Sequence, residues 1–580
     1  MHEAELRGIY PIAIKDCCMA ASLNTLLFIL AFTASTTFAA NMPDAGRLLN
    51  ENATTPSSFP WQAPPEHQQQ IGTGKQKLGS TRIKVSGFTF TGNTLFSDSE
   101  LSDLMANYKG EKLTLAELDN AVLTITNAYR KKGYFLASAF LPPQTLTPGT
   151  PLIIEVIEGV LEKMRVETKP AITRTQKSLL EYYANQVPSD QPLENGTLTS
   201  MVMRTNELPN ISSRILLEPG SRPGTTKATL EVIEGKPYGY SVNIDNYGNE
   251  ATGANHISGC MELYSPLHLG DQLTLRMQTS TIGNLQNVQT GYTIPVTPYG
   301  TKFGFNYNYV NYQMGGIFQT LKAYGNAHNL IFSLTQPIIR NRNLILNATL
   351  AGEGKMLDDR IESVQSRNQR LSASCQTGLT GIQMDNMLGG GSTALSLGFV
   401  RGQLSLNDAE TLSKDQTAQG LQSNGGYTKL NMSLARTQMI SHGLTLYAGA
   451  YGQWSNKNLN SSEQLSLAGP SAVRAWQTSE SYADKGVVAT AELRYLFDSN
   501  GELPGKLELS AFVDHGYAAL HITPLPDAGR NTSTLTGAGF GVKWFDAKNY
   551  SFQSTAAWKI SGASSPTESP MVYAQATKSF

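Results

Sequence analysis

The 580-residue sequence predicts a mainly β protein in which two α+β modules, each of order β-α-α-β-β, precede a 16-stranded antiparallel transmembrane β-barrel. Three observations support this fold class. The pentapeptide Glu-Val-Ile-Glu-Gly occurs twice, at residues 155–159 and 231–235, and each copy closes an apolar, β-branched run. After the second copy, helical periodicity gives way to strand-like alternation as far as Phe580. Charged residues are only 16% of the chain whereas glycines number 52, which suits a β-rich protein.

The N-terminus predicts a secretory signal peptide over residues 1–39. Two basic residues precede an apolar stretch from Met19 to Phe32, and the small residues that follow place cleavage near Ala39. A helical anchor is the alternative interpretation. The stretch before Met19 is long for a signal peptide, so Met19 is an alternative start. Export excludes cytoplasmic functions.

Composition excludes several further classes of function. The formal net charge of −1 gives no basic surface for nucleic acid. Eight scattered histidines and four cysteines form no cluster at metal-ligand spacing, so we expect neither a metal nor a cofactor. Cys260 and Cys375 lie beyond the signal peptide and could pair, although two small strand residues are the favoured interpretation.

Two similar modules follow a polar, proline-rich segment. Residues 40–80 contain this linker and one candidate helix at 44–51, for which a disordered tail is the alternative. In the first module, 81–159, the segment 114–117 has the Thr-x-x-Glu spacing of a capping box, which starts a helix. The second module, 160–235, repeats the order of elements. Neither contains a catalytic constellation, and exposed strand edges in both could accept an extended peptide.

From residue 236 to 580 the sequence alternates between an apolar, aromatic face and a polar face. In the segment 303–309, phenylalanine and tyrosine alternate with glycine and asparagine. A soluble sandwich also alternates, but long strands, aromatic residues near strand ends and a chain that ends inside a strand favour a membrane barrel. At roughly 20–22 residues per strand with its loop, the segment gives about 16 strands, an even number as such barrels require. The polar face would line a water-filled lumen.

One long loop, 465–485, interrupts this alternation. It contains the segment 468–476, Ala-Gly-Pro-Ser-Ala-Val-Arg-Ala-Trp. Further on lies Phe-Val-Asp-His-Gly at 512–516, where Asp514 has the parity of Phe512 and is expected to face the lumen. The loop arginine and the wall aspartate could pair if the loop folds inward.

These motifs resemble those of the two-partner secretion transporters, the TpsB proteins typified by ShlB, FhaC and HecB. The resemblance covers about residues 43–580. The loop motif of that family, Val-Arg-Gly-Tyr or Val-Arg-Ala-Tyr, is matched by 473–476 with tryptophan at the aromatic position. Its partner motif, Phe-x-Asp-x-Gly, is matched in full at 512–516. The modules look like two POTRA domains, 245–248 looks like the first barrel strand, and 43–47 looks like the start of the plug helix.

The resemblance implies an outer-membrane translocator. It would recognise one large TpsA-type, β-helical exoprotein, haemolysin-like or adhesin-like, through its POTRA domains and secrete it through the barrel pore. Outer-membrane lipid, the barrel-assembly machinery and periplasmic chaperones are the other implied partners. The implied site residues fall into four groups. Arg474 and Asp514 would form a loop-to-barrel latch, and Phe580 would be the terminal assembly signal. The loop motif comprises Gly469, Pro470, Val473, Ala475 and Trp476, and the barrel-wall motif comprises Phe512 and Gly516. Lys578 departs from the apolar residue usual near such a terminus.

Two alternatives stay open. An insertase of outer-membrane proteins, from the same superfamily, also joins POTRA domains to a 16-stranded barrel, although the count of two modules favours secretion. An outer-membrane enzyme is the other alternative. His515 beside Asp514 suggests part of a triad, but no Gly-x-Ser-x-Gly elbow is present. The glycine-rich segment 537–541 has no helix after it, unlike a dinucleotide-binding loop. We therefore expect no enzymatic activity.

Overall fold

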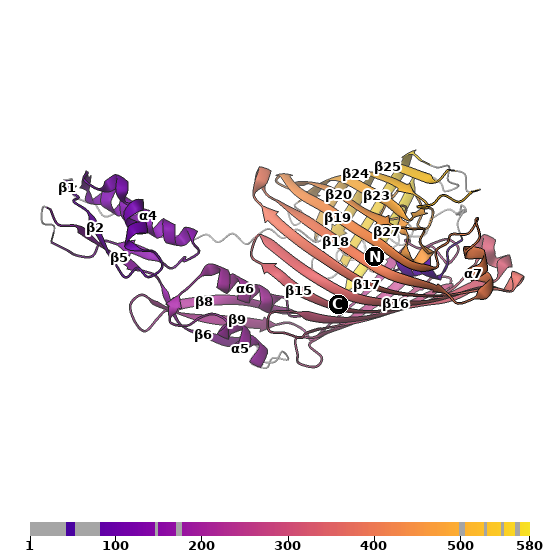
Figure 1. The fold of residues 1–580 in the computed structure, drawn as a ribbon, viewed down its shortest axis with the longest axis horizontal. Helices are drawn as coiled ribbons and strands as arrows, with labels where there is room; N and C mark the ends of the chain where they lie inside the picture. Colours follow the sequence, from indigo (N-terminus) through magenta and orange to yellow (C-terminus); the bar gives the residue numbers. More distant parts are fainter. Residues whose placement is uncertain are drawn as a thin grey trace, which may run out of the picture.

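The computed structural model joins two small modules to a large β-barrel (Figure 1). The predicted signal peptide, 1–39, and most of the predicted linker lie outside the residues that the structure describes. Those residues are 42–52, 82–145, 149–169, 177–497, 505–526, 530–546, 550–562 and 569–580.

The first module packs two helices against a small sheet. Its elements are β1 (Arg82–Lys84), β2 (Phe88–Thr91), α3 (Asp98–Leu104), β3 (Lys112–Thr114), α4 (Leu115–Lys131), β4 (Ser138–Phe140) and β5 (Leu152–Ile157). The sheet order is β2-β5-β4, and β1 pairs separately with β3. The capping box is confirmed, because Thr114 Oγ1 accepts from the N–H of Glu117 at 3.3 Å and the Glu117 carboxylate accepts from the N–H of Thr114 at 2.7 Å.

The second module repeats this arrangement with a four-stranded sheet. Its elements are β6 (Val160–Lys169), α5 (Lys177–Asn185), β7 (Gln191–Pro192), α6 (Asn195–Asn206), β8 (Ile211–Pro219) and β9 (Thr225–Glu234), with sheet order β7-β6-β9-β8. Phe135 and Leu136 of the first module pack against the core of the second. The Leu193 N–H of the second module donates to the Gly159 carbonyl of the first at 3.0 Å. The modules therefore contact each other closely where the first pentapeptide ends.

The second module contacts the barrel through the end of α6. The Glu207 carboxylate accepts from Arg340, and the Lys302 Nζ donates to the Glu207 carbonyl at 3.3 Å. Leu208 is buried, and a Cβ at Gly270 would lie 2.9 Å from its Cδ2. Strand ends and a turn at one end of the barrel thus contact the second module.

Sixteen strands close into an antiparallel barrel, as the sequence predicts. They are β10 (Tyr238–Asp245), β11 (His256–Tyr264), β12 (Gln272–Ser280), β13 (Leu285–Pro295), β14 (Lys302–Gln313), β15 (Ala323–Arg340), β16 (Leu344–Ile361), β17 (Ser366–Asp385), β18 (Gly391–Leu406), β19 (Gly425–Ser441), β20 (Leu444–Ser455), β23 (Lys485–Phe497), β24 (Lys506–Ala519), β25 (Thr532–Phe545), β26 (Tyr550–Ser561) and β27 (Met571–Ser579). The first and last strands close the barrel by pairing 241–245 with 575–579. No described helix is long and apolar enough to cross a membrane.

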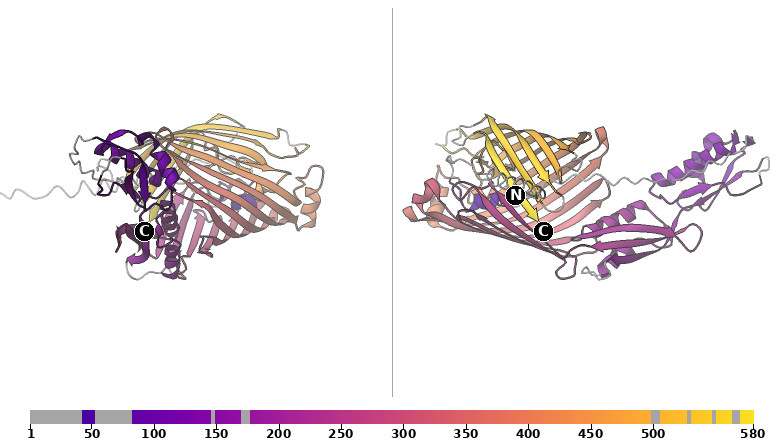
Figure 2. Two further views of the ribbon diagram at one scale, coloured as in Figure 1. Left: turned by 60° about the vertical axis from the view of Figure 1, so that its left-hand side comes forward. Right: turned by 180° about the vertical axis from the view of Figure 1, so that it is seen from behind.

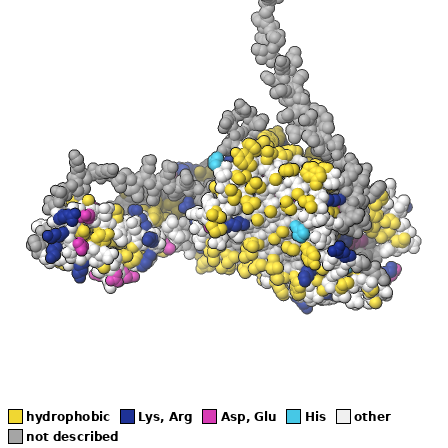
Figure 3. Space-filling model, turned by 90° about the horizontal axis from the view of Figure 1, so that it is seen from above, with side chains coloured by type: hydrophobic (Ala, Val, Ile, Leu, Met, Phe, Trp, Pro, Cys, Tyr) yellow, Lys and Arg dark blue, Asp and Glu magenta, His cyan; other side chains and the backbone are white. Residues whose placement is uncertain are grey.

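The outer face of the barrel is apolar and its ends carry aromatic side chains. Figure 3 shows hydrophobic side chains over much of the barrel wall, with scattered Lys and Arg side chains among them, and side chains of both charges on the module at the left. At the C-terminus, Phe580 stacks on Tyr240 with ring centroids 5.0 Å apart. The Lys578 Nζ lies 3.7 Å from the centroid of the Tyr550 ring, so this departure from the apolar pattern places its charge over an aromatic face. The apolar outer band and aromatic ends fit an outer-membrane barrel.

The lumen contains a short helix, α2 (Ala45–Glu51), and a long loop between β20 and β23 (Figure 2). Because β10 starts at the modules and the strands alternate in direction, the loop leaves β20 at the end of the barrel away from the modules and folds into the lumen. The loop includes the turn η5 (Ser461–Glu463) and a small pair of strands, β21 (Leu465–Ser466) and β22 (Tyr482–Ala483). The free thiols of Cys260 and Cys375 belong to strands of the wall.

Candidate functional site

The tip of the lumenal loop is a compact turn. The Val473 N–H donates to the Leu467 carbonyl at 3.0 Å, and Ala468 forms a bridge to Val473. Gly469 has a φ of +116°, a conformation that a side chain would strain, and it precedes Pro470 in the turn. This geometry directs Arg474, the residue after Val473, toward β23 and β24.

Arg474 forms a two-pronged ion pair with Asp514 on β24. Its Nε donates to Oδ2 and its Nη2 to Oδ1, each at 2.8 Å, and its backbone N–H donates to Oδ2 at 3.1 Å. Its Nη1 also donates to the Glu492 carboxylate at 3.0 Å. The guanidinium carbon lies 3.3 Å from the centroid of the Phe512 ring. One arginine thus contacts two strands of the wall, and each of its three guanidinium nitrogens donates a hydrogen bond to a carboxylate.

Asp514 is enclosed by the loop that it binds. Its side chain is 0% exposed, whereas the Arg474 side chain is 11% exposed. The Thr490 hydroxyl donates to the Asp514 Oδ1 at 2.9 Å. The carboxylate therefore accepts four hydrogen bonds, three from Arg474 and one from Thr490, in a place with little access for water.

Small residues in the wall make room for the loop. A Cβ at Gly516 would lie 3.1 Å from Val473 Cγ2, and one at Gly537 would lie 2.5 Å from Ala475 Cβ. Val473 and Ala475 are fully buried and Trp476 is 2% exposed, all in one apolar cluster with Phe512. The glycine-rich segment 537–541 is thus part of β25, and its first glycine lies against the loop.

Asp514 and His515 lie on opposite faces of β24. Asp514 contacts the loop, whereas the exposed His515 contacts the Thr536 hydroxyl on the neighbouring strand. The two side chains therefore form no pair of the kind that a catalytic triad needs. Within the described residues, no group of three His, Cys, Asp or Glu side chains could hold a metal ion.

A second ionic anchor holds the start of the loop, and the sequence motifs do not reveal it. Glu463 binds Lys355 at 2.7 Å and Lys429 at 2.8 Å, and its carboxylate is buried. Burial alone would raise the pKa of Glu463, but the two ammonium groups lower it to about 2. These three residues come from distant parts of the sequence, and only the closure of the barrel brings them together.

The helix α2 is held at its N-terminus by the wall and the loop together. Asp44 caps the helix by accepting from the Arg47 N–H at 2.9 Å, and its second oxygen binds Arg370 at 3.0 Å. Arg370 also donates to Asn460 at 3.2 Å and to Ser461 at 3.0 Å, both in the loop. Burial raises the pKa of Asp44, but Arg370 and Arg47 outweigh it and lower that pKa to about 2.

The C-terminus of α2 contacts the far side of the same loop. The Glu51 carboxylate accepts hydrogen bonds from Ser479 and Tyr482, and the Arg47 guanidinium lies 4.8 Å from the Tyr482 ring centroid. A Cβ at Gly46 would lie 2.7 Å from the Ser462 nitrogen, so the helix backbone touches η5. The helix and the loop therefore form one connected filling of the lumen.

Comparison with known proteins agrees with this architecture. The family described as haemolysin secretion/activation protein ShlB/FhaC/HecB matches residues 224–544, and the ShlB-type POTRA domain matches residues 83–159. The heme/hemopexin transporter protein HuxB of Haemophilus influenzae is 26% identical over 87% of this chain and 86% of its own length. The outer membrane transporter CdiB of Escherichia coli is 26% identical over 86% of this chain and 82% of its own length.

Solved structures show the same fold. The structure of CdiB from Escherichia coli aligns with a TM-score of 0.68 at 22% identity and covers 99% of this chain and 100% of that one. BamA from Haemophilus ducreyi, lacking POTRA domains 1–3, aligns with a TM-score of 0.50 at 14% identity and covers 86% of this chain. Since the family profile spans more than half of the chain, the protein belongs to the haemolysin secretion/activation family of ShlB, FhaC and HecB and is an outer-membrane transporter.

Proposed function

We propose that this transporter secretes one large TpsA-type, β-helical exoprotein through its barrel, and that the Arg474–Asp514 pair holds the lumenal loop in the resting position. The observation that carries the proposal is the two-pronged pair at 2.8 Å between a loop residue and a fully buried wall residue. A loop held inside the lumen by an ion pair can be retained or displaced. We propose that secretion requires the loop to be docked when the exoprotein arrives and to be displaced only as the polypeptide passes, so that a loop that is undocked from the start does not support export.

The two modules are proposed to capture the exoprotein in the periplasm. We assign 81–159 as the first POTRA domain, 160–235 as the second and 236–580 as the barrel, with 40–80 as the plug helix and linker. The repeated order of helices and strands supports the second assignment. Among the described strands, β8 pairs only with β9, and its exposed Leu216 and Leu217 lie along that edge. An unfolded exoprotein could add a strand there.

The driving force is proposed to be folding of the exoprotein outside the cell. The sequence contains no phosphate-binding loop of the Walker type. A β-helical repeat protein suits export without a nucleotide, because each emerging repeat can fold on the one before it. Outer-membrane lipid, periplasmic chaperones and the barrel-assembly machinery complete the proposed partners. We propose neither enzymatic activity nor binding of nucleic acid.

Secretion assays test this function directly. Deletion of the gene should remove one large β-repeat protein from the medium, and the intact gene should restore it. The coding sequence beside this one is the first candidate for that exoprotein. Loss of many outer-membrane proteins instead of one secreted protein would contradict the proposal and favour an insertase. An unchanged set of secreted proteins would also contradict it.

A further inference from the structure

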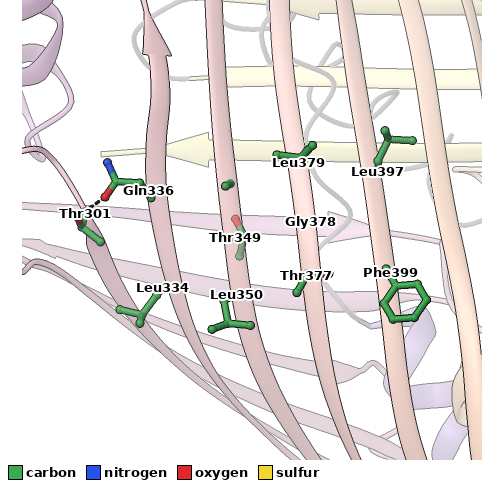
Figure 4. Close-up of a pocket in the computed structure, with 11 residues that line it drawn as sticks. Thr301, Leu334, Gln336, Thr349, Leu350, Thr377, Gly378, Leu379, Leu397 and Phe399 are labelled. Atoms are coloured by element: carbon green, nitrogen blue, oxygen red, sulfur yellow. Dashed lines mark hydrogen bonds between the residues drawn. The ribbon is translucent and has the colours of Figure 1, made fainter.

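The outer face of four neighbouring strands, β15 to β18, contains an open hollow of about 620 Å³. Four side chains of its lining come from successive strands and lie side by side in one row, which Figure 4 shows: Leu334, Leu350, Thr377 and Phe399. The leucines and the phenylalanine are 44% to 50% exposed on this side of the barrel. The hollow therefore faces the hydrocarbon of the membrane and is wide enough for an acyl chain.

An arginine stands directly beside this hollow. Arg401 is exposed and follows Phe399 by two positions on β18, so both side chains project from the same face at a spacing of about 7 Å. Its Nη1 donates to the Thr428 hydroxyl on β19 at 2.7 Å. Within the described part of the chain, no carboxylate pairs with it.

Two other outward arginines on described barrel strands have carboxylate partners. Arg367 binds Asp358 at 2.6 Å, and Arg436 binds Asp385 at 2.8 Å. Arg401 differs because its described partner is a neutral hydroxyl. A cation on the lipid-facing side of a barrel is most costly at the midplane and is tolerated near the head groups, where an anion can accompany it.

The position of Arg401 on the barrel indicates which anion can accompany it. On β18 the outward residues Leu395, Leu397 and Phe399 form an apolar run, Arg401 comes next, and polar Gln403 follows. Since β18 runs away from the modules, Arg401 lies at the extracellular end of that run. We infer that the head groups of the outer leaflet lie at this level, because the apolar run of β18 ends here. Phosphate matches the planar, two-pronged donor set of arginine.

We propose that lipopolysaccharide of the outer leaflet binds at this face, with a lipid A phosphate on Arg401 and one acyl chain in the hollow. Thr428 holds the guanidinium at the rim. The small side chains of Ala348 and Thr377 leave space between Leu334 and Phe399 for the chain. The site is independent of the proposed export path, because it lies on the opposite side of the barrel wall from the lumen.

Binding of purified rough lipopolysaccharide to the full chain in detergent tests the proposal. A fluorescent lipopolysaccharide is titrated against the unmodified protein, Arg401→Gln and the matched control Arg436→Gln, whose side chain is an outward arginine with a carboxylate partner. We expect Arg401→Gln to raise the Kd by about tenfold, the scale of one lost charge-assisted pair, and Arg436→Gln to leave it unchanged. Filling the hollow with Ala348→Phe is expected to weaken binding as well.

Two further arms identify the occupant and control for folding. Dephosphorylated lipopolysaccharide should bind the unmodified protein about as weakly as lipopolysaccharide binds Arg401→Gln. This comparison needs no variant, so it tests the role of the phosphate even if heat-modifiable gel migration shows that a variant has not assembled. Equal Kd values for Arg401→Gln and the unmodified protein would overturn the site. Equal competition by phosphatidylglycerol would overturn the assignment to lipopolysaccharide.

Discussion

Replacing Arg474 by alanine is expected to stop secretion while leaving the barrel assembled. The guanidinium donates to Asp514 through two nitrogens and to Glu492 through a third. Because the Asp514 side chain is fully buried, removal of its partner leaves an unpaired buried charge. Such a loss costs about 3–5 kcal/mol in a dry site and less where water enters. A cost of about 3 kcal/mol shifts the ratio of docked to undocked loop by more than about a hundredfold.

Three measurements separate the loop from the barrel. The exoprotein in the medium reports secretion, heat-modifiable gel migration reports assembly, and conductance in planar bilayers reports whether the loop still fills the lumen. We expect no secretion, normal migration and a larger or noisier conductance. Arg494→Ala is the matched control, because Arg494 also faces the lumen and contacts Glu492 at 3.1 Å. It should secrete nearly normally.

Normal secretion by Arg474→Ala would refute the reasoning. The Arg474→Lys variant sharpens the test, since lysine keeps the charge but lacks the planar fork. We expect it to secrete at an intermediate level. If lysine and alanine behaved alike, the charge would contribute nothing and the shape of the fork alone would matter.

Three other changes test neighbouring contacts. Burial raises the pKa of Glu51, so α2 docks most firmly when this carboxyl is protonated, below about pH 4.5, and docking weakens as pH rises through the raised pKa. Glutamine mimics the protonated carboxyl, so Glu51→Gln should keep α2 docked, lower bilayer conductance at neutral pH and flatten the pH dependence of conductance. Gly537→Leu should displace Ala475 and reduce secretion, because a Cβ alone would lie 2.5 Å from that methyl group, whereas normal secretion would show that the loop docks elsewhere. Glu207→Arg should loosen the second module from the barrel, measured as faster proteolysis between them, and Arg340→Glu in the same chain should restore protection; no restoration would contradict the ion pair.

The architecture could be predicted because its signals are local. Alternation within a strand reports which side chains share a face, so the parity of Phe512 and Asp514 was sufficient to place both toward the lumen. The capping box at Thr114 and Glu117 is likewise a pattern four residues long. The strand count followed from chain length alone. Such features do not depend on which distant segments meet.

The second anchor could not be predicted for the opposite reason. Lys355, Lys429 and Glu463 are separated by dozens of residues, and each alone fits an ordinary lumenal charge. Their meeting depends on how far the loop enters and at which height it crosses β16 and β19. The same holds for Gly537 of β25, whose purpose is visible only against Ala475. The alternation of the strands could have identified lumenal lysines as candidates for binding the loop, but not Glu463 as their partner.

Arg370 makes the positions of α2 and the loop depend on each other. Its guanidinium binds Asp44 of the helix cap and also Asn460 and Ser461 of the loop, and Ser461 Oγ itself donates to Asp44 at 2.6 Å. If α2 leaves, Arg370 and Ser461 lose the same carboxylate, so the loop loses part of its anchor at that moment. Conversely, withdrawal of the loop removes contacts from both ends of the helix, because Glu51 is also bound there. Burial of Leu48 in the helix is worth only about 1.5–3 kcal/mol, so these shared polar contacts are comparable to the apolar contribution of each side chain. Helix and loop should therefore clear the lumen together, and an exoprotein that displaces one lowers the cost of displacing the other.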